Sequence, residues 1–186
     1  VNRMLGFAFK KFDGAIPTPG ALDDEDKQLI ETVRSGSSKV FDLYEAVQLK
    51  GALEQTRALC QNVNQYLNDK APWKAIKESP EQAATSVYVA LQCIDWLATC
   101  WAPILPDSSQ KIRTALGYED RYFGDLGRQL VKDAMGQREV LRYQKGEAGI
   151  RWNTEPLPAG QAMNKPEAPF QKLDPDEIAK ETEGDA

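Results

Sequence analysis

The sequence predicts an all-α protein: an antiparallel helix bundle followed by an extended proline-rich tail. Two long stretches repeat apolar residues at helical three- and four-residue steps or their sums. The first holds Leu49, Leu53, Leu59, Val63 and Leu67, and the second holds Val87, Leu91, Ile94, Leu97 and Trp101. Before Gly117 no convincing alternation of apolar and polar residues indicates a strand. Such helices bury their apolar stripes against one another.

The first helix is expected over residues 1–12, in an apolar run that favours a segment taken from a longer protein. The glycines and prolines of residues 14–20 mark a loop after it. Acidic residues 23–26 then place negative charge where a helix N-terminus favours it. We therefore expect a short helix over residues 24–34 that ends near Ser35-Gly36.

Residues 38–68 show the next helical pattern, with an interruption expected near Gly51, and residues 68–73 break it. The sequence Ser-Pro-Glu-Gln at residues 79–82 has the capping serine, first-turn proline and capping-box glutamine of a helix start. Pro103 closes that helix, and residues 107–116 indicate one more, stopped by Gly117. Residues 1–117 are thus expected to form the bundle.

The pattern weakens after the bundle. Residues 118–154 form an extra segment to which the sequence assigns no role; we expect it to be partly helical, over residues 126–142. Residues 155–186 contain five prolines and scattered charges, which predict an extended tail packed on the bundle with a disordered end.

Composition excludes several classes of function. The chain has 41% hydrophobic and 27% charged residues, a net charge of -5 and no histidine. Without histidine or a Cys-x-x-Cys pair, neither a metal site nor a histidine-based catalytic arrangement is expected, and we assign no catalytic residue. Cys60, Cys93 and Cys100 are expected to be thiols, mostly buried. No run is long and apolar enough to span a bilayer, so we expect a cytoplasmic chain without membrane contact. We also expect the chain alone to be monomeric.

Three segments, in order, resemble the methionyl-tRNA synthetase family, and a weaker fourth follows them. They are Val1-Asn2-Arg3-Met4-Leu5-Gly6-Phe7 with Lys10-Lys11-Phe12-Asp13-Gly14; Asn64-Gln65-Tyr66-Leu67 with Lys70-Ala71-Pro72-Trp73 and Ile76-Lys77; Ala102-Pro103-Ile104-Leu105-Pro106 with Leu116-Gly117; and Pro166-Glu167-Ala168-Pro169-Phe170-Gln171-Lys172-Leu173-Asp174. Each segment is modest, but the ordered set is specific, and Ala-Pro-Trp is the most telling part. No counterpart is recognised for residues 118–152.

The resemblance implies that the bundle is of the class I synthetase anticodon-binding type. It further implies the anticodon-binding helical domain of a methionine–tRNA ligase, which recognises the CAU anticodon of methionine tRNA. The implied partners are that tRNA and the enzyme's catalytic half, whose nucleotide-binding and lysine-serine motifs are absent from this sequence. The resemblance implies that ATP binds to the catalytic half, and it leaves open whether zinc binds there too. No cofactor is expected in this chain. The alternative is a helical scaffold or protein-interaction domain without direct RNA contact.

Trp73 and Arg3 are the candidate anticodon-binding residues. Trp73 follows a proline in a short helix break, and bases of a single-stranded loop stack on such rings. The guanidinium of Arg3 can pair with a cytosine's carbonyl oxygen and ring nitrogen. The resemblance implies that the two residues read the first anticodon base, together with an asparagine four residues before the counterpart of Arg3, outside this chain. The sequence alone leaves open a Trp73 ring packed on the bundle and an Arg3 that is merely solvated.

Supporting contacts are expected from six further residues. Lys10 and Lys11 close the first helix, and Lys70, Lys74 and Lys77 flank Trp73. Such lysines could contact phosphates and position the loop without specifying its sequence, or they could form a solvated face offset by Asp69 and Glu78. Asn64 could hydrogen-bond the RNA or a local backbone group.

Overall fold

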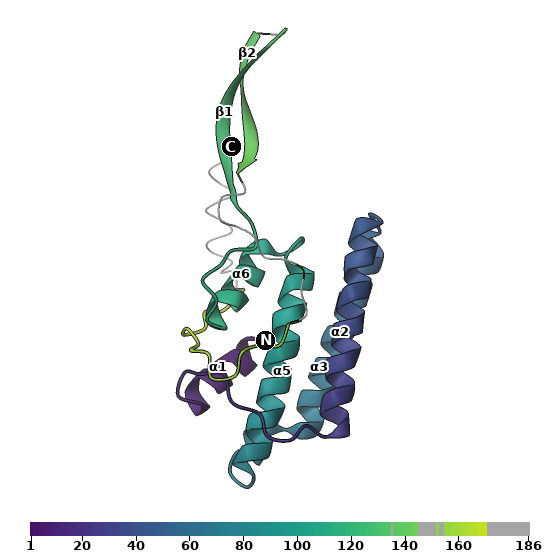
Figure 1. Cartoon of the computed structure of the whole chain (residues 1–186), viewed down its shortest axis with the longest axis vertical. Helices are drawn as coiled ribbons and strands as arrows, with labels where there is room; N and C mark the ends of the chain where they lie inside the picture. Colours follow the sequence, from purple (N-terminus) through teal and green to yellow (C-terminus); the bar gives the residue numbers. More distant parts are fainter. Residues whose placement is uncertain (135, 145–151, 153–154, 171–186) are drawn as a thin grey trace, which may run out of the picture.

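The computed structural model describes residues 1–134, 136–144, 152 and 155–170, and the predicted helix bundle is confirmed (Figure 1). Its helices are α1 Asn2–Lys11, α2 Asp24–Glu45, α3 Leu49–Lys70, α4 Pro72–Ala75, α5 Pro80–Trp101 and α6 Pro106–Ala115. An antiparallel hairpin of β1 Asp125–Asp133 and β2 Gly136–Gln144 projects from one end of the bundle. No described helix is long and apolar enough to cross a membrane.

Helix α2 is longer than the sequence indicated. Its start is fixed by a capping box in which the Asp23 carboxylate accepts from the Asp26 backbone N–H (2.9 Å) and the Asp26 carboxylate accepts from that of Asp23 (3.0 Å). The predicted stop near Gly36 is wrong, because this glycine is buried where Leu59 of α3 approaches α2. The chain turns instead at Val47, whose φ is 57°, so the predicted interruption near Gly51 lies a few residues too late.

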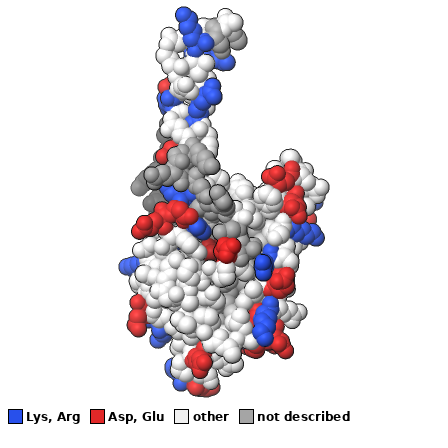
Figure 2. Space-filling model, viewed as in Figure 1, with Lys and Arg blue, Asp and Glu red and all other residues white. Residues whose placement is uncertain are grey.

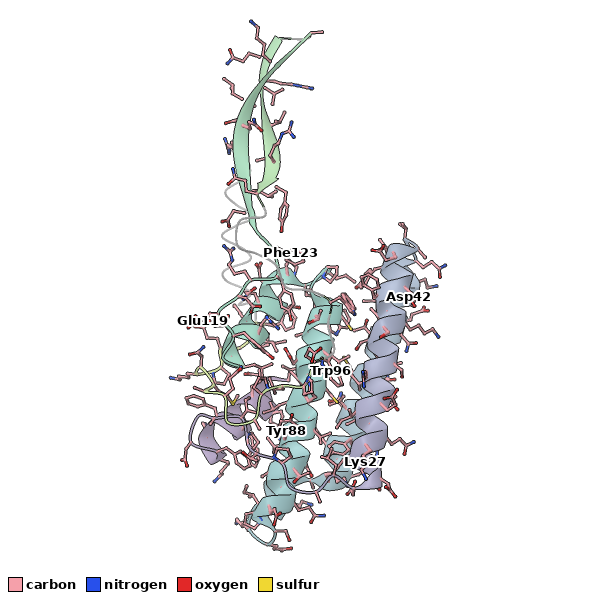
Figure 3. The ribbon with its side chains drawn as sticks, in the orientation of Figure 1. Lys27, Asp42, Tyr88, Trp96, Glu119 and Phe123 are labelled. Carbon is pink, nitrogen blue, oxygen red and sulfur yellow. The ribbon has the colours of Figure 1, made fainter. Side chains whose placement is uncertain are left out.

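Helix α5 is the centre of the core and is buried on almost every side. One side packs with α1, α6 and Leu157, and the other packs with α2 and α3. Cys93 and Cys100 are buried free thiols, and Cys60 is half-buried, where its sulfur lies 3.5 Å from the indole nitrogen of Trp101. The side chains seen in Figure 3 thus fill both flanks of one central helix.

The prediction that residues 118–154 are partly helical is wrong in its described part. Residues 125–133 and 136–144 form the two strands of the hairpin, with Leu126 opposite Tyr143 and Leu130 opposite Glu139. Leucines 126 and 130 stand four residues apart, which fits a helix face, but they also stand an even number apart, which fits one strand face. Gly136, the first residue of β2, has a φ of 112°, a conformation that glycine adopts without steric cost.

The loop before the hairpin is tied to the bundle by an arginine clamp, which consists of Asp95, Arg113, Tyr118, Asp120 and Tyr122. Arg113 donates two hydrogen bonds of 2.8 Å to the Asp120 carboxylate, and its Cζ lies 3.9 Å from the ring centroid of Tyr118. The Tyr122 ring is buried, and its hydroxyl lies 3.1 Å from that of Thr99. The clamp holds the base of the hairpin against α5 and α6.

Residues 155–164, here called the strap, cross the bundle in extended form. Tyr88 and Trp96 of α5, labelled in Figure 3, donate hydrogen bonds to the carbonyls of Leu157 and Glu155 at 2.8 and 3.1 Å. Farther along, the backbone N–H of Ile16 donates to the Gln161 carbonyl. The predicted disordered end, residues 181–186, lies outside the described residues.

Candidate nucleic-acid interface

Trp73 is presented by a sharp break between two helices. Helix α3 ends at Lys70, and Ala71, with a φ of 39°, both closes α3 and precedes α4. Pro72 then occupies the first position of α4, where its missing N–H costs no hydrogen bond. The Trp73 ring is half-buried and packs against the core cluster that contains Met4 and Leu5. The ring is therefore partly packed and partly accessible.

Arg3 lies over this ring. Its Cζ is 4.7 Å from the centroid of Trp73, and the Arg3 side chain is exposed to solvent. A guanidinium within about 6 Å of an indole face is attracted by the quadrupole of the ring. The structure thus brings together two predicted site residues from α1 and α4.

Asn64 is exposed on α3, six residues before the helix ends. A helix rises about 1.5 Å per residue, so Asn64 stands roughly 9 Å along the axis from Lys70. In the described part of the chain no hydrogen bond joins Asn64 to Arg3 or Trp73. Its predicted RNA contact stays a prediction.

Four of the five predicted lysines are exposed and form no ion pair within the described residues: Lys10, Lys11, Lys74 and Lys77. Lys10 follows Arg3 by seven residues on α1, which places both on one helix face about 10 Å apart along the axis. Lys74 directly follows Trp73 on α4. Lys10 and Lys11 lie in the last turn of α1, where a helix C-terminus favours positive charge.

Lys70 differs from the other four. Its amino group lies 2.5 Å from Asp23, 2.9 Å from Glu25 and 3.7 Å from Asp26, and only 12% of its side chain is exposed. Burial lowers the pKa of Lys70, but the three carboxylates outweigh burial and raise it above its ordinary value. The Tyr66 hydroxyl donates to the same Asp26 carboxylate at 2.7 Å. This geometry argues against a phosphate contact by Lys70.

The acidic run at the start of α2 lies close to the candidate site. Asp23 and Glu25 contact Lys70, three residues before Trp73. This contact between Lys70 and the acidic run was not predicted from the sequence. The negative charge of residues 23–26 was the one feature of the sequence that could have indicated it. The contact joins residues 47 positions apart, beyond the reach of local patterns.

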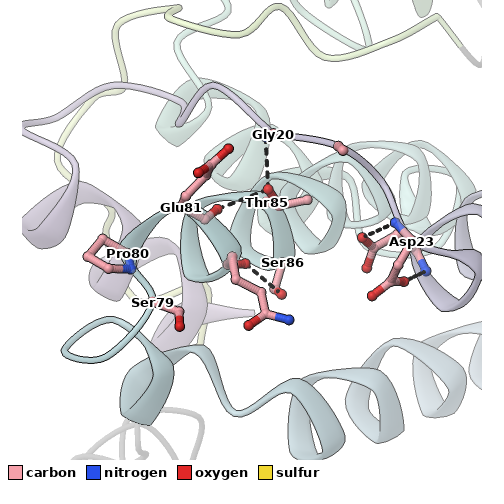
Figure 4. Close-up of a pocket in the computed structure, with 10 residues that line it drawn as sticks. Gly20, Asp23, Ser79, Pro80, Glu81, Thr85 and Ser86 are labelled. Atoms are coloured by element: carbon pink, nitrogen blue, oxygen red, sulfur yellow. Dashed lines mark hydrogen bonds between the residues drawn. The ribbon is translucent and has the colours of Figure 1, made fainter.

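An open hollow of about 470 Å³ lies beside this acidic run, between the start of α5 and residues 20–26 (Figure 4). The backbone N–H of Gly20 donates to the Thr85 hydroxyl at 2.8 Å and fixes one wall. The carboxylates of Asp23, Asp26 and Glu81 line it. Their negative charge disfavours a nucleic-acid phosphate there.

The geometry of Arg3 and Trp73 suits the recognition of a base. A half-buried indole and an exposed guanidinium can stack on and hydrogen-bond to an unstacked base. Figure 2 shows Lys and Arg scattered among acidic residues over the face in view, so any positive patch is local. Among the described residues no group of three or more Cys, Asp and Glu could hold a metal ion.

Comparison with known proteins matches residues 16–140 to the model of the anticodon binding domain of methionyl tRNA ligase. The methionine–tRNA ligase of Thermomicrobium roseum is 41% identical over 97% of this chain and 31% of its own length. That of Chloroflexus aurantiacus is 42% identical over 94% of this chain and 29% of its own length. The chain thus spans about a third of the length of the curated relatives it matches.

Comparison with solved structures finds a similar fold. The crystal structure of apo Mycobacterium tuberculosis methionyl-tRNA synthetase superposes with a TM-score of 0.70 at 24% identity, over 93% of this chain and 31% of that one. At this identity the likeness concerns the fold alone.

Proposed function

The chain belongs to the methionyl-tRNA synthetase family, whose anticodon-binding domain it contains, and on that premise we propose that Arg3 and Trp73 recognise the anticodon of methionine tRNA. The observation that carries the proposal is the guanidinium of Arg3 lying 4.7 Å from the centroid of the Trp73 ring. Two different base-recognition chemistries, stacking and edge hydrogen bonding, are thereby held within reach of one nucleotide.

In the proposed complex the first anticodon base, cytosine, stacks on Trp73. Because the ring is already packed against the bundle on one side, it is fixed before RNA arrives and loses little entropy on binding. Stacking on such a ring is worth about 1–3 kcal/mol per base. The base takes the place of the Arg3 guanidinium on the ring, and Arg3 then donates to the cytosine's carbonyl oxygen and ring nitrogen.

The remaining contacts position the RNA. Lys10, Lys11, Lys74 and Lys77 neutralise phosphates around the loop, and Asn64 donates or accepts one hydrogen bond at its edge. We leave Lys70 out of this set because Asp23, Glu25 and Asp26 already neutralise it.

For the whole protein we propose ATP-dependent joining of methionine to its tRNA. The catalytic half lies outside this chain and carries the ATP site. The present residues select the tRNA and supply no reacting group. We further propose that the enzyme works in the cytoplasm and that this chain alone is monomeric.

The proposal is tested with a methionine anticodon stem-loop and a copy in which the first anticodon base is changed. The dissociation constant of the 186-residue chain is measured for both at one fixed salt concentration. We expect the wild type to prefer the CAU loop, and we expect Trp73→Ala to weaken that loop about 10-fold or more and to remove the preference. A wild type that binds both loops equally contradicts the proposal.

Two matched variants sharpen the test. Trp73→Phe keeps an aromatic face and should retain part of the preference, because every base stacks on an aromatic ring. Phe41→Ala removes an aromatic side chain, 40% exposed, from α2, and should leave both dissociation constants unchanged. A loss of affinity in Phe41→Ala equal to that in Trp73→Ala would show that the effect is not specific to the site.

A further inference from the structure

The hairpin differs from the rest of the described structure, because it is a two-stranded sheet that stands apart from the helix bundle. Its strands pair from Asp125 opposite Gln144 to Asp133 opposite Gly136, and it stands beyond the end of the bundle (Figure 1). No described helix covers it. A two-stranded ribbon by itself is at best marginally stable in water and needs a further strand or a packed face.

Its two faces differ in character. Opposed residues of an antiparallel pair lie on the same face. One face carries the pairs Leu126 and Tyr143, Arg128 and Leu141, Leu130 and Glu139, and Lys132 and Gln137. The large apolar side chains that the described hairpin residues expose fall on this face: Leu126 at 67%, Leu130 at 61%, Leu141 at 65% and Tyr143 at 54%. The same face carries an ion pair of 3.3 Å between Arg128 and Glu139. We call it the apolar face.

The opposite face is more polar. It carries the pairs Asp125 and Gln144, Gly127 and Arg142, Gln129 and Val140, Val131 and Arg138, and Asp133 and Gly136. Its two valines are half-buried, whereas Gln129 and Arg142 are exposed. The exposed large apolar side chains of the described hairpin residues are therefore concentrated on one face.

The hairpin is also held in a defined direction. The arginine clamp fixes its base to α5 and α6, and Phe123 lies at that junction (Figure 3). The Tyr143 hydroxyl accepts a hydrogen bond of 2.8 Å from the Gly124 backbone N–H, which ties the second strand to the base of the first. A held, exposed apolar face is a contact surface rather than a loose loop.

The size of the face limits what can cover it. Nine residues per strand at about 3.3 Å each give a length of roughly 30 Å, and two strands with side chains are about 10 Å wide, so one face offers about 300 Å². A specific interface between separate proteins buries about 800 Å² on each partner. The face is too small for a freely diffusing partner or for a stable dimer. It is adequate for a surface in the same chain, where tethering gives an effective concentration of the order of millimolar.

We propose that the apolar face of the hairpin packs against an apolar surface in the part of the full-length ligase that lies outside these 186 residues. The curated relatives are about three times as long as the region matched, so most of such an enzyme is available as a tethered partner. The hairpin then acts as a second contact between the two parts of the enzyme, in addition to the chain connection. This inference rests on family membership and does not depend on anticodon reading by Arg3 and Trp73.

The test compares neighbouring residues that face opposite ways. Leu130→Cys and Leu141→Cys probe the apolar face, and Gln129→Cys and Arg142→Cys are matched controls on the other face. Each variant is made in the 186-residue chain and in the full-length enzyme, and the maleimide reaction rate at the introduced thiol is followed by mass spectrometry. We expect residues 130 and 141 to react at least 10-fold more slowly in the full-length enzyme than in the 186-residue chain. The two controls should react at similar rates in both.

Every other pattern overturns the proposal. Equal rates at 130 and 141 in both proteins mean that nothing in the enzyme covers the face. Protection in the 186-residue chain that grows with its concentration means that a second copy covers it. Protection that appears only when tRNA is added means that RNA covers it. None of these outcomes bears on whether Trp73→Ala loses anticodon preference, so the two proposals fail separately.

Discussion

Asp95 of α5 and Arg113 of α6 form a nearly buried ion pair, with Nη1 of the arginine 3.4 Å from Oδ1 of the aspartate. Only 7% of the Asp95 side chain and 11% of the Arg113 side chain are exposed. The Tyr118 hydroxyl donates to the other Asp95 oxygen at 3.1 Å. The central helix is thereby joined, through one carboxylate, to the loop that carries the hairpin.

The first prediction concerns the pH dependence of this pair. Burial raises the pKa of Asp95 to about 6, against the opposing effects of Arg113 and Tyr118. An unfolded aspartate titrates near 3.9, so between about pH 4 and 6 the folded protein holds a proton that the unfolded chain releases. The contribution of Asp95 to stability is therefore greatest below pH 4 and falls as pH rises through 6.

Asp95→Asn cannot titrate and should remove this dependence. The free energy of unfolding of the variant minus that of the wild type should rise by about 2 kcal/mol between pH 4.5 and 7.5. Urea unfolding at several pH values, followed by circular dichroism, measures the difference. A difference that stays constant with pH would mean that Asp95 titrates alike in the folded and unfolded chains.

The second prediction concerns the strap. Gln92 is 2% exposed, and its amide donates to the Glu155 carbonyl (3.3 Å) and accepts from the backbone N–H of Leu157. Gln92→Leu keeps the size but leaves the buried Leu157 N–H without a partner, and should lower the free energy of unfolding by about 2–4 kcal/mol. Gln65→Leu, whose amide contacts Asp69 on the surface, should change it by less than about 0.5 kcal/mol. Equal small effects would show that Gln92 does not hold the strap.

The helices of the bundle were predictable because their apolar residues face a core. Leu59 and Val63 of α3 and Leu91 of α5 are buried, so apolar residues are required at these positions. The sequence therefore shows apolar residues at helical spacing. On the hairpin nothing described covers Leu126, Leu130 or Leu141. Burial therefore does not force apolar and polar residues to alternate along the strands, and the sequence lacks that signal. The sequence of the strands was consequently interpreted as a weak helical pattern over residues 126–142.

The candidate site was predictable only in part. Trp73 stands out because Ala71 and Pro72 break the helix in the sequence itself, and the family resemblance selects Arg3. That Arg3 lies on the Trp73 ring depends on how α1 packs, which no local pattern encodes. The pairing of Lys70 with Asp23 likewise joins two helix ends across the bundle, so its charge alone suggested an exposed lysine.

The third prediction separates Lys70 from Lys74. Lys70→Gln leaves the carboxylates of Asp23, Glu25 and Asp26 crowded together, so it should lower the free energy of unfolding by about 1–3 kcal/mol. In a folded sample its affinity for the anticodon stem-loop should stay within about 2-fold of the wild type. Lys74→Gln should leave stability unchanged, weaken binding several-fold and reduce the slope of log affinity against log salt by about 1. The reverse assignment of the two effects would restore Lys70 as the phosphate contact.

The fourth prediction concerns the junction where the bundle meets the strap. Gly117 has a φ of 93°, and a Cβ placed there would lie 1.9 Å from the Ala162 carbonyl oxygen, a backbone atom that cannot turn aside. In Gly117→Ala, an alanine must adopt a positive φ, and the strap must move away from its Cβ. The variant should therefore lower the free energy of unfolding by about 2–4 kcal/mol.

Gly6→Ala is the matched control, because nothing lies within 4 Å of a Cβ placed at residue 6 and the residue is helical. Since alanine is the better helix former, Gly6→Ala should raise the free energy of unfolding by up to about 1 kcal/mol. If chemical denaturation gives both variants the stability of the wild type, residue 162 does not pack on residue 117, and the path of the strap over the bundle must differ from that in Figure 1.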